Sequence, residues 1–177
     1  LFRSLSAIRP LRLAPPRATV GRFAANYSRG PEKALRREDD PQNSMYLRPR
    51  TFFSGGGGLV STAHDYLRFC RMLVNGGEYN GKRLLSRNTV RMMTTNQVGD
   101  LFGTNGFGLG FSITSAKGSA SLPVQEGAFE WGGAFTTTYW ADPRERIIGI
   151  IYRQHWHIND NGISNKFKVL TYSAIND

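Results

Sequence analysis

The clearest hydrophobic pattern in the chain predicts a helix over residues 62–75. Thr62, followed three residues later by Asp65, has the spacing of an N-terminal capping box. Apolar residues then recur at helical spacing, and arginines occupy positions off that face. The Asn-Gly-Gly run at 75–77 is typical of a helix end. The apolar face comprises Tyr66, Phe69, Cys70 and Leu73.

The remaining patterns predict shorter elements, most of them strands. Ser86 is placed to cap a second helix that ends near Asn96. Aromatic and β-branched residues between short turn signals favour strands. We expect a strand over 107–114, a loop over 115–121, an antiparallel meander of strands over 129–133, 135–141 and 146–154, and a closing helix over 166–175. The predicted fold class is therefore α+β, an antiparallel sheet with flanking helices.

The positive charge is concentrated at the start of the chain. Residues 1–50 hold 11 Lys and Arg against four Asp and Glu, whereas residues 51–177 hold 12 against nine. We therefore divide the chain into a basic, poorly ordered segment (1–30), a charged, proline-flanked linker (31–50) and a folded part (51–177). The Arg-rich, acid-free start also resembles an organellar transit segment. A cytoplasmic location is slightly favoured, and the compartment stays open.

Composition excludes several functional classes. The longest apolar run, residues 147–152, is far shorter than the roughly 20 residues of a membrane span. The single cysteine, Cys70, excludes an internal disulfide and a cysteine-rich zinc site. The basic segment lacks the interleaved aromatic residues and the companion fold of a nucleic-acid arm, so we expect no nucleic-acid partner.

Three patterns resemble ligand sites, but none predicts one. The glycines at 55–58 precede a helix without the Lys and Ser or Thr of a phosphate-binding loop, so we interpret them as a loop that permits close packing. The glycines at 106, 108 and 110 do not have dinucleotide-binding spacing. His155 and His157 lack a third convergent ligand. We therefore expect no cofactor and no metal.

Six motifs, in the same order along the chain, resemble those of the serine β-lactamase-like hydrolases. This family includes class C β-lactamases, penicillin-binding carboxypeptidases and esterases of the same fold. Each motif alone is weak, but their shared order is specific. The resemblance covers residues 21–177 and only what looks like the C-terminal half of such an enzyme. The motifs are residues 54–62 (SGGGGLVST), 72–77 (MLVNGG), 84–86 (LLS), 92–96 (MMTTN), 106–111 (GFGLGF), and 131–133 (WGG) followed by 140–143 (WADP).

The resemblance implies acyl-serine chemistry. In this family the Ser of a Ser-x-x-Lys motif attacks a carbonyl, and the Lys and the Tyr of a Tyr-x-Asn motif move the proton. A third motif lies on a strand beside the site, and Trp131, Gly132 and Gly133 stand in its place. Glycines there allow an acyl group to lie against the backbone, and by position the N–H of Ala134 donates to the oxyanion. With Trp131 lining the cleft, we expect a small-molecule ester or amide with an apolar acyl group.

The other two family motifs are missing. No serine has a lysine three residues later, and no tyrosine has an asparagine two residues later. We therefore predict that the chain is inactive as it stands. A fragment or gene-model error that omits the catalytic helical half is favoured by the start at Leu1; a non-catalytic binding module derived from the fold is the alternative. In either case a partial β-lactamase/transpeptidase-like fold exposes its inner cleft face, so we expect self-association.

Overall fold

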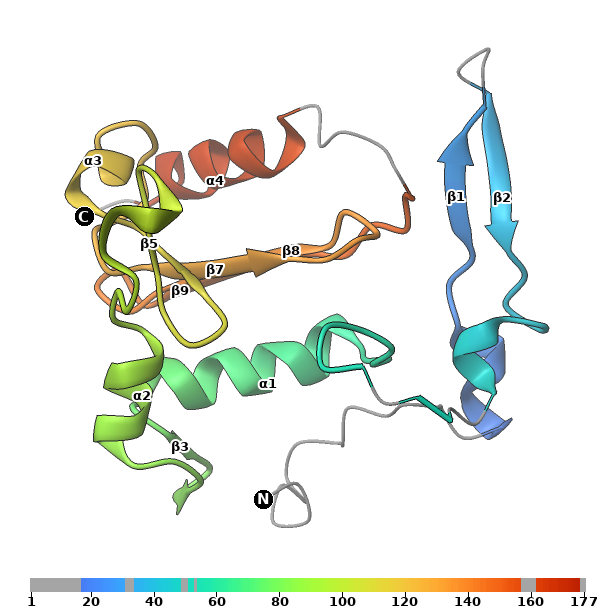
Figure 1. Ribbon diagram of the computed structural model, residues 1–177, viewed down its shortest axis with the longest axis horizontal. Helices are drawn as coiled ribbons and strands as arrows, with labels where there is room; N and C mark the ends of the chain where they lie inside the picture. The colour runs from blue at the N-terminus through green and yellow to red at the C-terminus, as the bar shows by residue number, and fades with distance from the viewer. Residues whose placement is uncertain (1–16, 31–33, 49–50, 53, 157–161, 176–177) are drawn as a thin grey trace.

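The computed structural model describes residues 17–30, 34–48, 51–52, 54–156 and 162–175. Its central feature is a five-stranded antiparallel sheet, and two separate strand pairs, β1–β2 and β3–β4, lie outside it (Figure 1). The elements in chain order are η2 (Arg17–Arg22), β1 (Asn26–Arg29), β2 (Leu35–Asp39), η3 (Met45–Leu47), α1 (Ala63–Val74), β3 (Glu78–Tyr79), β4 (Lys82–Arg83), α2 (Arg87–Met93), η4 (Gly99–Phe102), β5 (Gly106–Phe107), β6 (Ser112–Ile113), α3 (Ala116–Ser119), β7 (Phe129–Gly132), β8 (Thr138–Asp142), β9 (Ile147–Ile151) and α4 (Ile163–Ser173).

The central sheet is a meander in which every strand pairs with its neighbours in sequence. Its order is β5-β6-β7-β8-β9, and all pairs are antiparallel. β8 and β9 pair along their whole length, from Thr138 opposite Ile151 to Asp142 opposite Ile147. The three-strand meander predicted from the sequence is confirmed as β7, β8 and β9, and with the flanking helices it confirms the α+β class.

The single strand expected over residues 107–114 is wrong, because this segment is the β5–β6 hairpin. The N–H of Gly108 donates to the carbonyl of Phe111 at 2.8 Å and closes the turn. Gly110 has a φ of +96°, a conformation that favours glycine. A Cβ on Gly108 would lie 2.0 Å from the carbonyl oxygen of Met93. These glycines therefore permit a chain reversal packed against the end of α2.

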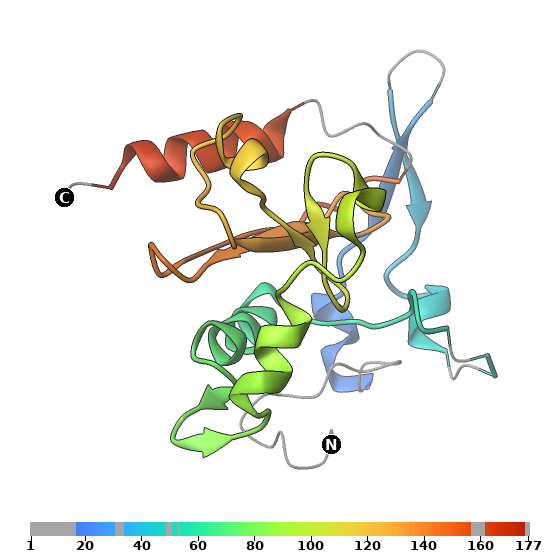
Figure 2. The same cartoon turned by 60° about the vertical axis from the view of Figure 1, so that its left-hand side comes forward.

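Helices cover both faces of the sheet, so the body has three layers. In Figures 1 and 2, α1 and α2 lie on one side of the sheet and α4 on the other. No helix among the described residues combines the length and apolar character that crossing a membrane requires. The cluster on the α1 side includes Cys70, Met72, Leu73, Val90, Ile113, Phe129, Tyr139 and Ala141. The smaller cluster holds Val124, Ala128 and Trp140, with Leu122 and Tyr172 packed against it.

The predicted helix after the glycine-rich loop is confirmed as α1. Thr62 Oγ1 accepts from the N–H of Asp65 at 3.1 Å, and the hydroxyl donates to the Asp65 carboxylate at 3.1 Å. At the other end, Gly77 has a φ of +96°, and a Cβ there would lie 2.2 Å from the carbonyl oxygen of Leu85. A side chain at Gly77 would therefore displace the segment that follows the helix.

Three smaller elements differ in extent from the predictions. α2 ends at Met93 rather than near Asn96, because the hydroxyls of Thr94 and Thr95 donate to carbonyls of the last turn at 3.0 and 2.7 Å. The loop expected over 115–121 contains the short helix α3, which the Ser115 side chain caps. The closing helix is confirmed as α4, with bounds slightly earlier than 166–175.

The N-terminal region contains two strands where we expected a poorly ordered segment and a linker. β1 and β2 form an antiparallel hairpin that crosses the predicted boundary at residue 30. β1 also bonds to the segment after β9. The N–H of Tyr27 donates to the carbonyl of Gln154 at 2.9 Å, and the N–H of Trp156 donates to the carbonyl of Tyr27 at 2.7 Å. The hairpin therefore lies beside the body at the right of Figure 1.

The glycine-rich loop before α1 is not closely packed. A Cβ on Gly55 or Gly57 would meet no described atom within 4 Å, so the close packing expected for these positions is wrong. Gly58 has a φ of +94°. This left-handed conformation favours glycine at that position.

Candidate functional site

The Trp-Gly-Gly segment lies on a strand that is open along one side. Trp131 and Gly132 pair with β8. On the opposite side, β6 pairs only with the first two residues of β7, so the end of β7 extends past its neighbour. Trp131 is 44% exposed, and the two glycines and Ala134 are also exposed. The segment therefore presents a backbone edge and an indole ring to solvent.

Both glycines of the segment lie close to Thr137 in the turn between β7 and β8. A Cβ on Gly133 would lie 2.5 Å from Thr137 Oγ1, and a Cβ on Gly132 would lie 3.0 Å from the Thr137 carbonyl oxygen. The N–H of Gly133 donates to that same carbonyl at 2.9 Å. We expected the glycines to let an acyl group approach the backbone. The close contact with Thr137 is a second, structural reason for them.

Ala134 occupies the corner of this turn. Two N–H groups of the turn are engaged: that of Gly133 donates to the Thr137 carbonyl, and that of Thr136 donates to the Gly133 carbonyl at 2.9 Å. The N–H of Phe135 has no acceptor among the described hydrogen bonds. Within the described part of the chain, no hydrogen bond takes the N–H of Ala134. An exposed backbone N–H beside a strand end is the kind of donor that stabilises a developing oxyanion. The role of Ala134 as that donor stays a prediction.

Two hydrogen bonds from the segment after β9 hold the turn at residues 133–137. Arg153 Nε donates to the carbonyl of Thr136 at 3.0 Å. The N–H of His155 donates to the carbonyl of Phe135 at 3.1 Å. Thr136 has a φ of +60°, which a β-branched residue rarely adopts, so surrounding contacts must maintain it.

The ring of Phe135 anchors the same turn from another direction. It packs edge-to-face on Tyr46 of η3, with 5.8 Å between ring centroids, and in a tilted arrangement on Trp156, with 4.9 Å between ring centroids. Tyr46 in turn contacts Phe23 at 6.5 Å. The N-terminal region, which we expected to be a tail and a linker, therefore packs on the turn that carries Ala134.

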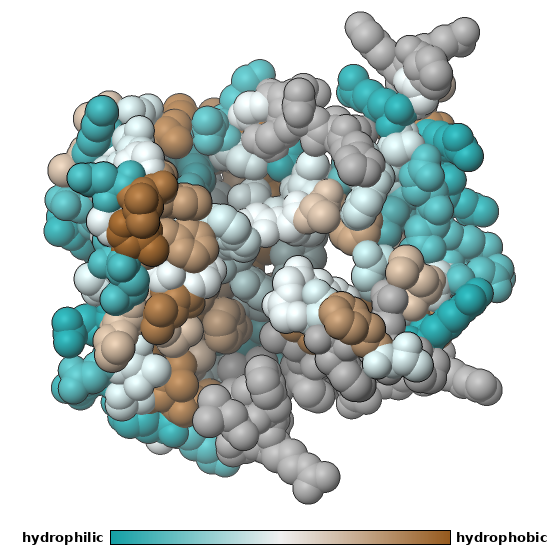
Figure 3. All heavy atoms as spheres, viewed as in Figure 1, coloured by the Kyte–Doolittle hydropathy of each residue, from teal (hydrophilic) through white to brown (hydrophobic). Residues whose placement is uncertain are grey.

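The exposed tryptophan belongs to a cluster of three aromatic rings. The Trp131 ring lies 5.0 Å from Phe107 of β5 and 6.1 Å from Phe102 of η4, and the two phenylalanines lie 4.8 Å apart. We call Phe102, Phe107 and Trp131 the aromatic shelf. Figure 3 shows hydrophobic side chains gathered on the surface over η4 and the β5–β6 hairpin.

A buried ion pair supports β7 from the other face of the sheet. Lys168 of α4 donates to the carboxylate of Glu130, the residue before Trp131. Lys168 is 5% exposed, and its ammonium also lies 5.9 Å from the Trp140 ring. An ion pair in this environment connects α4 to the strand that carries the candidate site.

Phenols and a thiol on the α1 side of the sheet are held in their protonated forms. Burial raises the pKa of the Tyr66 phenol and of the Cys70 thiol to about 12 each. Burial also raises the pKa values of Tyr139 and Tyr152. These groups are hydrogen-bond donors at neutral pH, not bases or nucleophiles, and Cys70 is fully buried.

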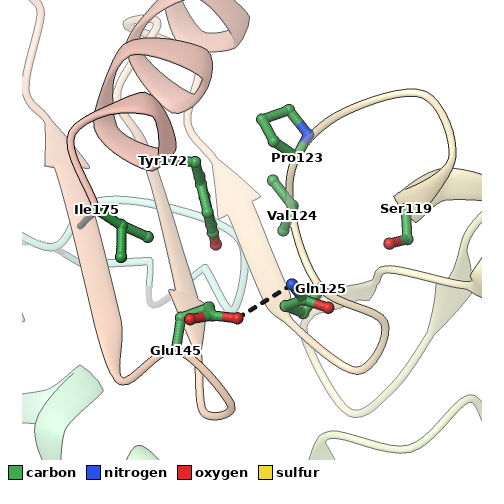
Figure 4. Close-up of a pocket in the computed structure, with 7 residues that line it drawn as sticks. All are labelled: Ser119, Pro123, Val124, Gln125, Glu145, Tyr172 and Ile175. Atoms are coloured by element: carbon green, nitrogen blue, oxygen red, sulfur yellow. Dashed lines mark hydrogen bonds between the residues drawn. The ribbon is translucent and has the colours of Figure 1, made fainter. Parts of the chain in front are cut away.

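A hollow lies at the end of the sheet where β8 turns into β9. It has a volume of about 340 Å³, and Figure 4 shows Tyr172 and Val124 facing it, with Gln125 Nε2 donating to Glu145 at 3.0 Å. Beneath it the buried carboxylate of Asp142 accepts from the Tyr172 hydroxyl at 2.6 Å. The hollow is at the opposite end of β8 from Ala134, so it is separate from the candidate site. Its remaining lining residues are Ser119, Pro123 and Ile175.

The described residues include no group of three His, Cys, Asp or Glu side chains placed to hold a metal ion. His157, half of the histidine pair noted in the sequence, lies outside the described residues. Sequence reasoning did not identify Arg153, Tyr46 or Lys168 as residues around the site. Lys168 gave no distinct signal, because Lys166 lies two residues earlier in the same expected helix.

Curated relatives of the chain come from Mycobacterium tuberculosis. They include protein Rv1367c and an uncharacterised protein of a second strain, each 38% identical over 130 residues. The matched region is 66% of this chain and 32% of each relative. The chain therefore spans about a third of the length of the curated relatives that it matches.

Solved structures share the fold at low sequence identity. EstCE1, a hydrolase with promiscuous acyltransferase activity, matches 95% of this chain and 46% of its own, with a TM-score of 0.72 and 20% identity. Unliganded simvastatin synthase (LovD) from Aspergillus terreus matches 97% of this chain and 48% of its own, with a TM-score of 0.70 and 17% identity. The predicted partial fold is confirmed, since this chain matches less than half of each structure.

The family model described as Beta-lactamase matches residues 8–171. This match begins before the first expected motif and covers nearly the whole chain. The resemblance inferred from the ordered motifs is confirmed: the chain belongs to the β-lactamase family.

Proposed function

We propose that this chain forms the carbonyl-binding wall of a β-lactamase-family serine hydrolase. In this proposal the N–H of Ala134 donates to the carbonyl oxygen of a small-molecule ester or amide, and Trp131 contacts its acyl group. The chain corresponds to the C-terminal part of a longer protein that hydrolyses the substrate through an acyl-serine intermediate. The observation that carries the proposal is that Ala134 is an exposed residue beside the Trp-Gly-Gly strand and that no hydrogen bond among the described residues takes its N–H.

The rigidity of the turn supports this assignment. A donor contributes most when it is already aimed at the position of the developing charge, because no reorganisation is then needed during the reaction. Arg153, His155 and Phe135 hold the turn from outside the hairpin.

The missing motifs define what the chain does not do alone. Without a Ser-x-x-Lys and a Tyr-x-Asn among its 177 residues, it has neither the family's nucleophile nor its proton carrier. Cys70 does not replace them, since burial keeps its thiol protonated and inaccessible. We therefore propose that the chain is inactive by itself and that hydrolysis belongs to the longer protein.

A fluorophosphonate probe and a p-nitrophenyl ester test this proposal. Both are applied to the 177-residue chain and to any longer product of the same gene. We expect the short chain to be unlabelled and inactive, and the longer product to be labelled on a serine and to release p-nitrophenol. Labelling of the short chain would overturn the argument from the missing motifs.

A non-catalytic binding module is the alternative function, and the absence of both catalytic motifs favours it. A longer product that binds carbonyl compounds but is never labelled would decide for this alternative.

Large apolar side chains are exposed on the isolated chain, including Phe52 at 79% and Leu101 at 90%. We therefore also propose that the chain self-associates through its exposed inner cleft face, and a monomeric profile in sedimentation over a range of concentrations would contradict it.

A further inference from the structure

The aromatic shelf is exposed although its members are large apolar side chains. Phe102 is 42% exposed and Trp131 is 44% exposed. Two neighbouring leucines extend the apolar surface, with Leu101 at 90% and Leu109 at 53% exposure. A contiguous apolar surface of this kind is unfavourable in water and commonly marks a binding site.

Hydrogen bonds from Asn96 hold the shelf in place before any ligand arrives. Asn96 Oδ1 accepts from the N–H of Phe107 and from the N–H of Val98, each at 3.1 Å. Its Nδ2 donates to the carbonyl of Gly99 at 2.9 Å. One side chain therefore connects η4, which carries Phe102, to β5, which carries Phe107. These bonds fix the backbone positions from which the two phenylalanine rings extend.

One member of the shelf, Trp131, lies on β7, the strand that leads to the proposed carbonyl donor. Three residues after Trp131 the chain reaches Ala134, whose N–H has no acceptor among the described residues. A molecule whose carbonyl oxygen accepts from Ala134 would place the substituent of that carbonyl along β7. The side chains of the shelf then determine which substituents bind well there.

We propose that the aromatic shelf binds the apolar acyl chain of the substrate, with Phe102 as a specificity-determining residue. This inference rests on the proposed function, because the carbonyl donor fixes which end of the molecule meets the shelf. The three rings offer dispersion contacts and no hydrogen-bond acceptor. The acidic residue within η4, Asp100, disfavours an anionic substituent. The shelf therefore selects a neutral acyl chain of several carbons over a short or charged acyl group.

A carbonyl compound that no nucleophile cleaves tests this inference on the 177-residue chain. We titrate the chain with 2-nonanone and with acetone and follow the backbone amides and the indole N–H groups by NMR. The variants are Phe102→Ala and, as a matched control, Leu170→Ala, which removes an exposed leucine of α4 (69% exposed). Phe102→Leu, which keeps an apolar side chain, is the conservative variant.

We expect 2-nonanone to shift the Trp131 indole signal and to bind about five- to tenfold more weakly to Phe102→Ala, because a ring that becomes partly buried contributes on the order of 1 kcal/mol. Leu170→Ala should bind as the unaltered chain does, Phe102→Leu should recover most of the affinity, and acetone should leave the indole unshifted. Equal affinity of Phe102→Ala and Leu170→Ala overturns the inference. If binding depends on Phe102 but the Ala134 amide does not shift, the shelf stands and the proposed role of Ala134 fails.

Discussion

Arg153 donates through Nε to the carbonyl of Thr136 at 3.0 Å, across the turn between β7 and β8. Thr136 is the residue of that turn with a left-handed backbone, at a φ of +60°. Charged donors to carbonyls are stronger than neutral ones. The contact therefore fixes the conformation of the segment that presents Ala134, and it comes from a residue that lies beyond β9 in the chain.

Replacing Arg153 with Met should loosen the turn at residues 133–137. The Thr136 carbonyl loses its charged donor, so we expect faster amide hydrogen exchange in the turn and a loss of about 1–3 kcal/mol in the free energy of unfolding. Exchange measured by mass spectrometry and urea denaturation check this. Arg91→Met, at an exposed position of α2, is the control. Unchanged exchange in the turn would show that Arg153 does not position it.

Replacing Lys168 with Met should destabilise the fold more than replacing both members of its ion pair. The single change leaves the Glu130 carboxylate without its partner in a largely buried site, at an expected cost of about 2–4 kcal/mol. The double variant Lys168→Met with Glu130→Leu should recover part of that loss, because no unpaired charge remains. A double-mutant cycle by chemical denaturation measures the coupling, and strictly additive losses would contradict this account.

Replacing Gly149 with Ala should disrupt the packing of Trp140. A Cβ at this position would lie 2.0 Å from the Trp140 ring, which is fully buried, so the ring or β9 must move. We expect a loss of about 1–3 kcal/mol or more and a red-shifted tryptophan emission. Gly57→Ala is the matched control, because no described atom lies within 4 Å of the added Cβ. The two variants melting at the same temperature would argue against this packing.

Stability should fall at high pH because buried acids must stay protonated in the folded state. Burial raises the pKa of Cys70 to about 12, above its ordinary value near 9, and Tyr66 shifts in the same direction. Between these values the unfolded chain releases a proton that the folded chain retains, so the stabilisation is complete below about pH 9 and is lost as the pH rises towards 12. Urea denaturation from pH 8 to pH 11 measures this slope.

The variant Cys70→Ala should show a shallower decline in stability over the same range, although its absolute stability is lower because a cavity remains. In the folded chain, the Cys70 thiol should not react with iodoacetamide at pH 8, and it should react once the chain is unfolded. Rapid alkylation of the folded chain would contradict the burial on which this prediction depends.

Local sequence signals predicted the elements whose causes are local. The Thr62–Asp65 cap and the apolar positions at helical spacing identified α1, and the aromatic and β-branched runs identified β7, β8 and β9. The β5–β6 hairpin was missed because glycines at 108 and 110 are compatible both with close packing within a strand and with chain reversal. Both occur: Gly108 packs on Met93, and the Gly108–Phe111 hydrogen bond and the positive φ of Gly110 reverse the chain.

The contacts that arrange the candidate site are long-range, and for this reason the sequence did not reveal them. Trp131 and Ala134 were found through a family resemblance of motifs. Tyr46 and Arg153 reach the same turn from regions far apart in the sequence, and no spacing rule connects them to it. β2 was overlooked because its LRRED sequence has no apolar alternation and its pairing comes from β1.

The role of the Ala134 N–H as a carbonyl donor is tested most directly by removing this N–H from an active, longer product of the same gene. Ala134→Pro deletes the N–H without breaking any hydrogen bond found among the described residues, and Ala134→Ser, which keeps the N–H, is the control. With a p-nitrophenyl ester, we predict that kcat falls on the order of 10²–10³-fold in Ala134→Pro at little change in KM, while Ala134→Ser and the melting temperatures of both variants stay near the unaltered values. A folded Ala134→Pro variant with undiminished kcat would contradict the account.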